Sequence, residues 1–163
     1  MMRPFPIVAA AGAAFLLAAC VSGAVSLATI ATDADDIATG LAAAAKDMRD
    51  ANLLSAAQLV QVDDALSTVA AASAAVARAT SATAAEPEVE QLASGVNAMI
   101  AALSEVATLP APVPEILAAV NVMLPVLESA VGLPAPAGAA QAMTPAAAER
   151  ILAEQAAAFR AGH

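Results

Sequence analysis

Hydrophobic and polar residues follow a helical period along most of the chain after residue 20. In the segments 24–50, 56–83 and 87–109, apolar residues recur at spacings that alternate between three and four residues. This spacing places them on one face of a helix, and charged residues fall outside each apolar stripe. No sustained alternation with a period of two is present, so strands are not indicated. The pattern predicts an all-α chain.

Three stripes define the predicted core. The first consists of Leu27, Ile30, Ala34, Ile37, Leu41, Ala44 and Met48. The second consists of Leu59, Val62, Leu66, Val69, Ser73, Val76 and Thr80. The third consists of Val89, Leu92, Val96, Met99, Leu103 and Val106. Because the connections at 51–55 and 84–86 are short, neighbouring helices must run antiparallel. We therefore expect an up-down-up three-helix bundle over 20–109, with an intermolecular coiled coil as the alternative.

Residues at the expected helix ends support these boundaries. Ser55 and Gln58 form a capping-box pattern at the start of the second helix. Pro87 suits the first turn of the third helix, where its missing N–H is not needed. Thr144 and Pro145 predict the N-cap and first residue of a C-terminal helix over about 145–161. That helix lies in an Ala-rich C-terminal stretch, 139–163, and has few large apolar residues, so we expect it to be loosely attached.

A different kind of segment lies between Pro-rich stretches, within 110–138. Residues 114–131 carry a broad apolar face and few polar positions, and Pro125 is expected to kink the helix. Three interpretations stay open: a fourth helix buried on the bundle, a helix that binds a partner, and a helix at the membrane surface. A partner is favoured over a membrane surface because the segment has no basic residue. The candidate partner-binding residues are Ile116, Val120, Met123, Leu124 and Leu127.

Composition removes many activities from consideration. The chain is 61% hydrophobic, but about a third of its residues are alanine, and it has one His, one Cys and 2% aromatic residues. A His/Cys zinc site, a Cys/His nucleophile pair or an internal disulfide has almost nothing to be built from. The formal charge of −9 argues against nucleic acid as a partner. We expect no catalytic residue, no metal, no cofactor and no small-molecule substrate.

Two polar motifs are candidates for metal-binding or catalytic sites. Asp33, Asp35 and Asp36 lack the glycine turn and distal glutamate of a calcium loop, so we interpret them as a solvated helix surface. Ser94-Gly95 lacks the first glycine of a nucleophile elbow. Neither motif therefore predicts a catalytic or metal site.

The first twenty residues carry the most specific motif. Arg3 is followed by an apolar stretch over 7–17, which suits a signal peptide and is too short to span a bilayer. The stretch ends in Leu17-Ala18-Ala19-Cys20, which resembles the lipobox of bacterial lipoproteins. The resemblance implies that residues 1–19 are a signal peptide and that Cys20 is the lipidated first residue of the mature chain. The alternatives are an ordinary secretory signal and an uncleaved anchor.

The resemblance also suggests a location. By similarity to enterobacterial sorting rules, Val21 rather than Asp after the cysteine implies the outer membrane, facing the periplasm. We therefore expect a lipid-anchored, non-enzymatic helical protein of the cell envelope with a structural or interaction role. Its expected partners are the membrane, another envelope protein or a second copy of the chain.

A second resemblance concerns residues 49–58, Arg-Asp-Ala-Asn-Leu-Leu-Ser-Ala-Ala-Gln. Together with the lipobox and the Ala-rich helices, this segment is similar to small lipoproteins of phages and prophages. The similarity implies an alternative role in lysis, such as that of a spanin subunit, or in modifying the host envelope.

Overall fold

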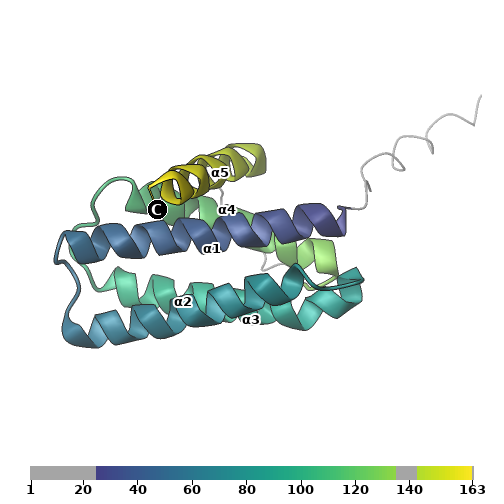
Figure 1. The fold of residues 1–163 in the computed structure, drawn as a ribbon, viewed down its shortest axis with the longest axis horizontal. Helices are drawn as coiled ribbons and strands as arrows, with labels where there is room; N and C mark the ends of the chain where they lie inside the picture. Colours follow the sequence, from purple (N-terminus) through teal and green to yellow (C-terminus); the bar gives the residue numbers. More distant parts are fainter. Residues whose placement is uncertain (1–24, 135–142, 163) are drawn as a thin grey trace, which may run out of the picture.

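The computed structural model describes residues 25–134 and 143–162, and it is all-helical there, as predicted (Figure 1). The helices are α1 (Leu27–Asp50), α2 (Ala56–Val76), α3 (Ala82–Ser104), α4 (Val113–Val131) and α5 (Pro145–Ala161). Side-chain oxygens cap four of these helices at their N-termini, those of Ser26, Ser55, Ser81 and Thr144. Each cap satisfies a backbone N–H that has no partner within its helix.

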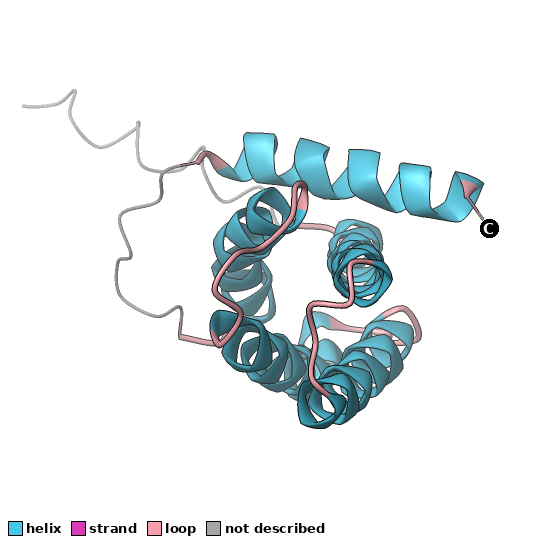
Figure 2. Ribbon diagram, turned by 90° about the vertical axis from the view of Figure 1, so that its left-hand side faces the viewer, coloured by secondary structure: helices cyan, strands magenta, loops and turns pink. Residues whose placement is uncertain are grey.

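Helices α1 to α4 surround one core. Helix α1 packs on α2 and α4, and α3 packs on the same two helices from the opposite corner. Helix α5 lies across the outside of α1 and α4, as the end-on view shows (Figure 2). A single cluster of buried apolar residues draws on all five helices. The prediction of a three-helix bundle left α4 out of the core, although α4 also contributes buried residues to it.

The stripe of α1 is confirmed with one exception. Its residues from Ile30 to Met48 are fully buried, while Leu27 at the start of the helix is half-buried. Because this face points into the core of its own chain, the structure favours the intramolecular bundle over an intermolecular coiled coil.

The stripe of α2 is only partly correct. Val62, Val69 and Val76 are buried as predicted, but Leu59 and Leu66 are only half-buried. Two alanines that lie beside the predicted line, Ala65 and Ala72, are buried instead. Small side chains on this side of α2 allow α3 to approach closely, so the buried face turns toward α3 and away from the two leucines.

The turn between α2 and α3 lies earlier than predicted. Helix α2 ends at Val76 and α3 begins at Ala82, so the connection is 77–81 and Thr80 is outside both helices. Ser81 caps α3 by accepting a hydrogen bond from the Ala84 N–H at 3.1 Å. Pro87 lies inside α3, where the helix loses the one hydrogen bond its nitrogen cannot donate. The prediction that the helix starts at Pro87 was wrong, because Ser81 caps the helix one turn and more before the proline.

The turn between α1 and α2 agrees with the sequence. The Gln58 N–H donates to Ser55 Oγ at 3.3 Å, and the Ser55 N–H donates to Gln58 Oε1 at 2.9 Å. The predicted capping box is thus confirmed. Asn52, in the same turn, adopts a left-handed backbone with φ of 55°. Asparagine tolerates this conformation better than most residues, which helps the chain reverse direction.

Candidate functional site

The lipobox, Leu17 to Cys20, lies outside the described residues. Helix α1 begins only a few residues later, at Leu27. The N-terminal end of α1, the α2–α3 connection and the C-terminal end of α4 lie at the same end of the bundle (Figure 1). That end is therefore the one nearest to Cys20 along the chain. Lipidation stays a prediction from the sequence.

The candidate partner-binding face of α4 is buried. Ile116, Val120, Met123, Leu124 and Leu127 are each at most 6% exposed. They face the core that α4 shares with the other helices, so a partner has no access to them. The partner-binding interpretation of this face was wrong, and the interpretation of a fourth core helix is confirmed. Pro125 lies inside α4 without ending it.

Two described helices, α2 and α4, are long and apolar enough to cross a membrane by length and composition alone. The criterion is also met by core helices of soluble bundles. Nine of the nineteen residues of α4 are buried against the rest of the protein, which accounts for its apolar character.

Helix α5 is held on the bundle more firmly than its composition predicted. Ala148, Leu152 and Ala156 are buried against α1 and α4. Gly40 of α1 makes room for Leu152, because a Cβ atom at Gly40 would lie 3.0 Å from Leu152 Cδ2. The prediction of loose attachment did not take Gly40 into account. Because Gly40 has no side chain, α5 can pack closely on α1 with only a few apolar residues.

An ion-pair cluster also joins α5 to α1. The Arg160 guanidinium lies 2.6 Å from an Asp35 oxygen and 3.2 Å from an Asp36 oxygen. The Asp36 side chain is 13% exposed, so this pair is better shielded from water than an ordinary surface pair. Two of the three aspartates considered for calcium thus serve as the acceptors for an arginine of α5.

The third aspartate was misread. Asp33 is only 7% exposed, not solvated as predicted, in a helix against which α2, α4 and α5 all pack. Burial, together with the negative charges of Glu149 on α5 and Asp36 on α1, raises the pKa of Asp33 to about 6. Within the described residues, no basic side chain forms an ion pair with Asp33. The carboxyl group therefore carries an unusual cost when it is ionised.

Glu128, near the end of α4, is a second shielded carboxyl group. One of its oxygens is buried without a hydrogen-bond partner among the described residues. Burial raises the pKa of this carboxyl above its usual value. Unlike Asp33, it has no ionisable neighbour that shifts it further.

The surface hollows are open depressions between helices. The largest, about 420 Å³, lies between α2 and α3 and includes Ser94 and Gly95. A Cβ atom at Gly95 would lie 2.8 Å from Val69 Cγ2, so this glycine serves the close approach of α2 and α3. The other two hollows, of about 310 and 320 Å³, both include Phe159 of α5.

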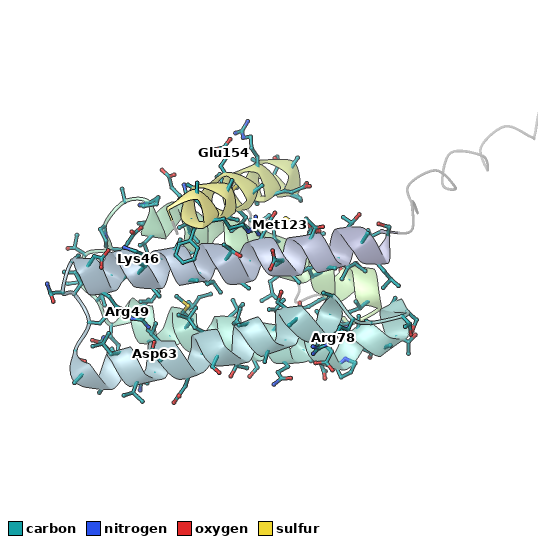
Figure 3. The ribbon with its side chains drawn as sticks, in the orientation of Figure 1. Lys46, Arg49, Asp63, Arg78, Met123 and Glu154 are labelled. Atoms are coloured by element: carbon teal, nitrogen blue, oxygen red, sulfur yellow. The ribbon has the colours of Figure 1, made fainter. Side chains whose placement is uncertain are left out.

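Metal-ligating chemistry is not assembled in the described part of the chain. Among residues 25–134 and 143–162, no three His, Cys, Asp or Glu side chains lie together in a group that could hold a metal ion. Exposed ion pairs occur along the helices instead. One joins Arg49 of α1 to Asp63 of α2 (Figure 3).

No protein-family model, curated protein or solved structure matches the chain.

Proposed function

We propose that the protein is a lipid-anchored, non-enzymatic helical component of the bacterial cell envelope, held in the outer membrane and facing the periplasm. The observation that carries the proposal is Leu17-Ala18-Ala19-Cys20 directly after a charged residue and a short apolar stretch. In the resembling lipoproteins the cysteine thiol receives a diacylglyceryl group, and the new amino group after cleavage is a further acylation site. Two or three acyl chains give stable membrane attachment, whereas one is marginal.

The fold is compatible with such an anchor. The core of the described residues is built from α1 to α5, and the first of these helices begins at Leu27, a few residues after Cys20. Helix α1 has 24 residues and is about 36 Å long at 1.5 Å per residue. With only a few residues between Cys20 and α1, the folded body stays within roughly that distance of the membrane. A structural or interaction role near the membrane surface fits these dimensions.

Partners of the folded body are the less defined part of the proposal. Without residues 1–19 the chain loses Arg3, its only charge there, so the mature protein carries a net side-chain charge of about −10. This charge favours a partner with a basic surface over an anionic one. The partner is another envelope protein or a second copy of the chain, and the α4 face is not the contact.

The phage-lysis alternative rests on the segment 49–58, which forms the turn between α1 and α2. Its Ser55 and Gln58 form a helix cap and its Asn52 adopts the left-handed backbone of the turn. The alternative stays a prediction from the sequence.

The test is metabolic labelling with palmitate in a bacterial host, for the native chain and for Cys20→Ser. We expect the native chain to be labelled, processed and found in membranes. The variant is expected to be unlabelled and to keep its signal peptide. Ser22→Ala, a matched control two residues away, is expected to behave as the native chain.

Two results would contradict the proposal. Processing of Cys20→Ser at the normal position would indicate an ordinary secretory signal. A native chain that keeps residues 1–19 and takes up no palmitate would indicate an uncleaved anchor. A further variant, Val21→Asp, tests the sorting step alone, since it is expected to move the labelled protein to the inner membrane.

A further inference from the structure

Helix α5 is connected to the bundle differently from the other four. It lies outside the ring of α1 to α4 and crosses it at a steep angle (Figure 2). Its apolar contribution is small, with three buried residues, Ala148, Leu152 and Ala156, against nine in α4. Because α1 to α4 already surround a core, α5 is the element whose separation costs the least buried apolar surface.

The contact between α5 and α1 combines attraction and repulsion. At one end, Arg160 of α5 binds Asp35 and Asp36 of α1. In the middle, Leu152 lies over Gly40. Near the start of α5, the acidic Glu149 acts on the buried carboxyl of Asp33, so two groups of the same charge face each other across the contact.

Among residues 25–134 and 143–162, the charges that act on Asp33 are all of its own sign. The two charges that act on it are Glu149 from α5 and Asp36 from α1 itself, and both are acidic. The ionisable residues of α4 are Glu115 and Glu128, and neither is among the groups that perturb it. Both arginines of α5 have other carboxylates, since Arg150 lies 3.9 Å from Glu154 and Arg160 binds the two neighbouring aspartates.

We propose that α5 is an acid-strengthened latch: it docks tightly on α1 when Asp33 is neutral and is loosened when Asp33 is ionised. When Asp33 is protonated, the contact buries a neutral group and the repulsion from Glu149 disappears. When Asp33 is ionised, docking buries a negative charge beside a second one. Separation of α5 returns Asp33 to water and uncovers Gly40 and the apolar groove of α1 and α4 below Leu152. The device goes beyond the proposed anchoring, since it acts within the folded body whether or not Cys20 carries a lipid.

The direction of the pH dependence follows from linkage. The pKa of Asp33 is about 6 in the docked protein, against 3.8 for an ordinary aspartate. Protons therefore bind the docked form more tightly, and docking strengthens as the pH falls through 6. The difference limits the change in the docking equilibrium to about 100-fold, of which about tenfold develops between pH 7.5 and 5.

The test is hydrogen exchange of the full chain at pH 5.5 and 7.5, with each rate corrected for the pH dependence of intrinsic exchange. Amides of α5 are compared with amides of α3, which serve as an internal reference within the bundle. We expect the protection of α5 relative to α3 to fall by about fourfold at the higher pH. Equal relative protection at both pH values would overturn the proposal.

Three variants separate the latch from general acid effects. Asp33→Asn keeps the size of the side chain without a charge, so α5 is expected to be well protected at both pH values. Glu149→Gln is expected to raise protection at pH 7.5 and to reduce the pH dependence. Glu154→Gln is the matched control, since Glu154 points away from the bundle on the outer side of α5 (Figure 3). It is expected to keep the native pH dependence.

Each variant can contradict the mechanism. A native pH dependence in Asp33→Asn would show that another group controls α5. If Asp33→Asn does not fold, Glu149→Gln carries the test alone, because an unchanged pH profile there would remove the charge repulsion on which the latch depends. An equal effect of Glu154→Gln would show that only the net charge matters.

Discussion

Replacing Gly95 by alanine tests the close contact between α2 and α3. An added Cβ atom at this position would lie 2.8 Å from Val69 Cγ2 and 3.3 Å from the Ala65 carbonyl oxygen. Real Cβ atoms almost never approach another heavy atom to 2.8 Å, so α2 and α3 must move apart or Val69 must leave its preferred rotamer. Overpacking of this kind costs about 1–3 kcal/mol.

The opposing effect has a known size. Alanine is favoured over glycine inside a helix by about 1 kcal/mol, so an unobstructed Gly-to-Ala change in α3 stabilises. The backbone oxygen of Ala65 cannot rotate away, and Val69 is fully buried. We expect the steric cost to exceed the gain in helix propensity, which gives a net loss of about 1 kcal/mol.

The assay is urea unfolding followed by circular dichroism at 222 nm, since the chain has no Trp or Tyr for fluorescence. A loss of about 1 kcal/mol lowers the midpoint by roughly 0.5–1 M urea. Ser94→Ala, at the exposed neighbouring position, is the matched control and is expected to leave the midpoint nearly unchanged. Gly40→Ala is the graded comparison, because its added Cβ meets the movable end of Leu152 rather than backbone. A Gly95→Ala variant as stable as the native chain would refute the close approach of α2 and α3.

Three further predictions concern the core, a cap and a buried acid. Leu92→Ala, at a fully buried position, is expected to destabilise by about 2–5 kcal/mol in the same urea assay, whereas Leu53→Ala, at a position 39% exposed, should cost far less; similar losses at both sites would contradict the predicted core. Ser55→Ala removes the α2 cap and is expected to cost about 1 kcal/mol, and no loss would mean that water replaces the serine oxygen fully. Burial raises the pKa of Glu128, so the native chain should become more stable as the pH falls through the raised pKa. Glu128→Gln should be more stable than the native chain at pH 7 and should gain less stability on acidification. A Glu128→Gln variant less stable than the native chain at pH 7 would argue against a shielded carboxyl.

The helical class and most of the core were predictable from the sequence, because helix period and burial coincide wherever large apolar residues define the stripe. This holds for Ile37, Leu92 and Met99, which are predicted and fully buried. The hydrophobic pattern predicts the buried face incorrectly where alanine residues form the contact between two helices. In α2 the stripe of larger residues contains Leu66, but the close contact with α3 needs small side chains, so Ala65 and Ala72 are buried instead.

The errors at the candidate sites arise because other helices pack on the surfaces concerned. A periodicity argument treats each helix alone, so it assigned Asp33 to a solvated face without taking into account the helices that pack on α1. A signal was nevertheless present, since Gly40 lies seven residues further along the same side of α1. A glycine in mid-helix indicates that another element comes close. The burial of the α4 face was open for the same reason, because a broad apolar surface fits a core and a partner equally well.

The central claim is that Cys20 carries the membrane anchor, and the mass of the N-terminal peptide tests it most directly. The protein is purified from membranes and digested with trypsin, which is expected to cut after Lys46 as the first basic residue beyond Cys20. The account predicts a peptide that begins at Cys20 and carries a diacylglyceryl group, with or without a third acyl chain on its amino group. A peptide that begins at Cys20 with a free thiol, or one that still contains residues before Cys20, would contradict it.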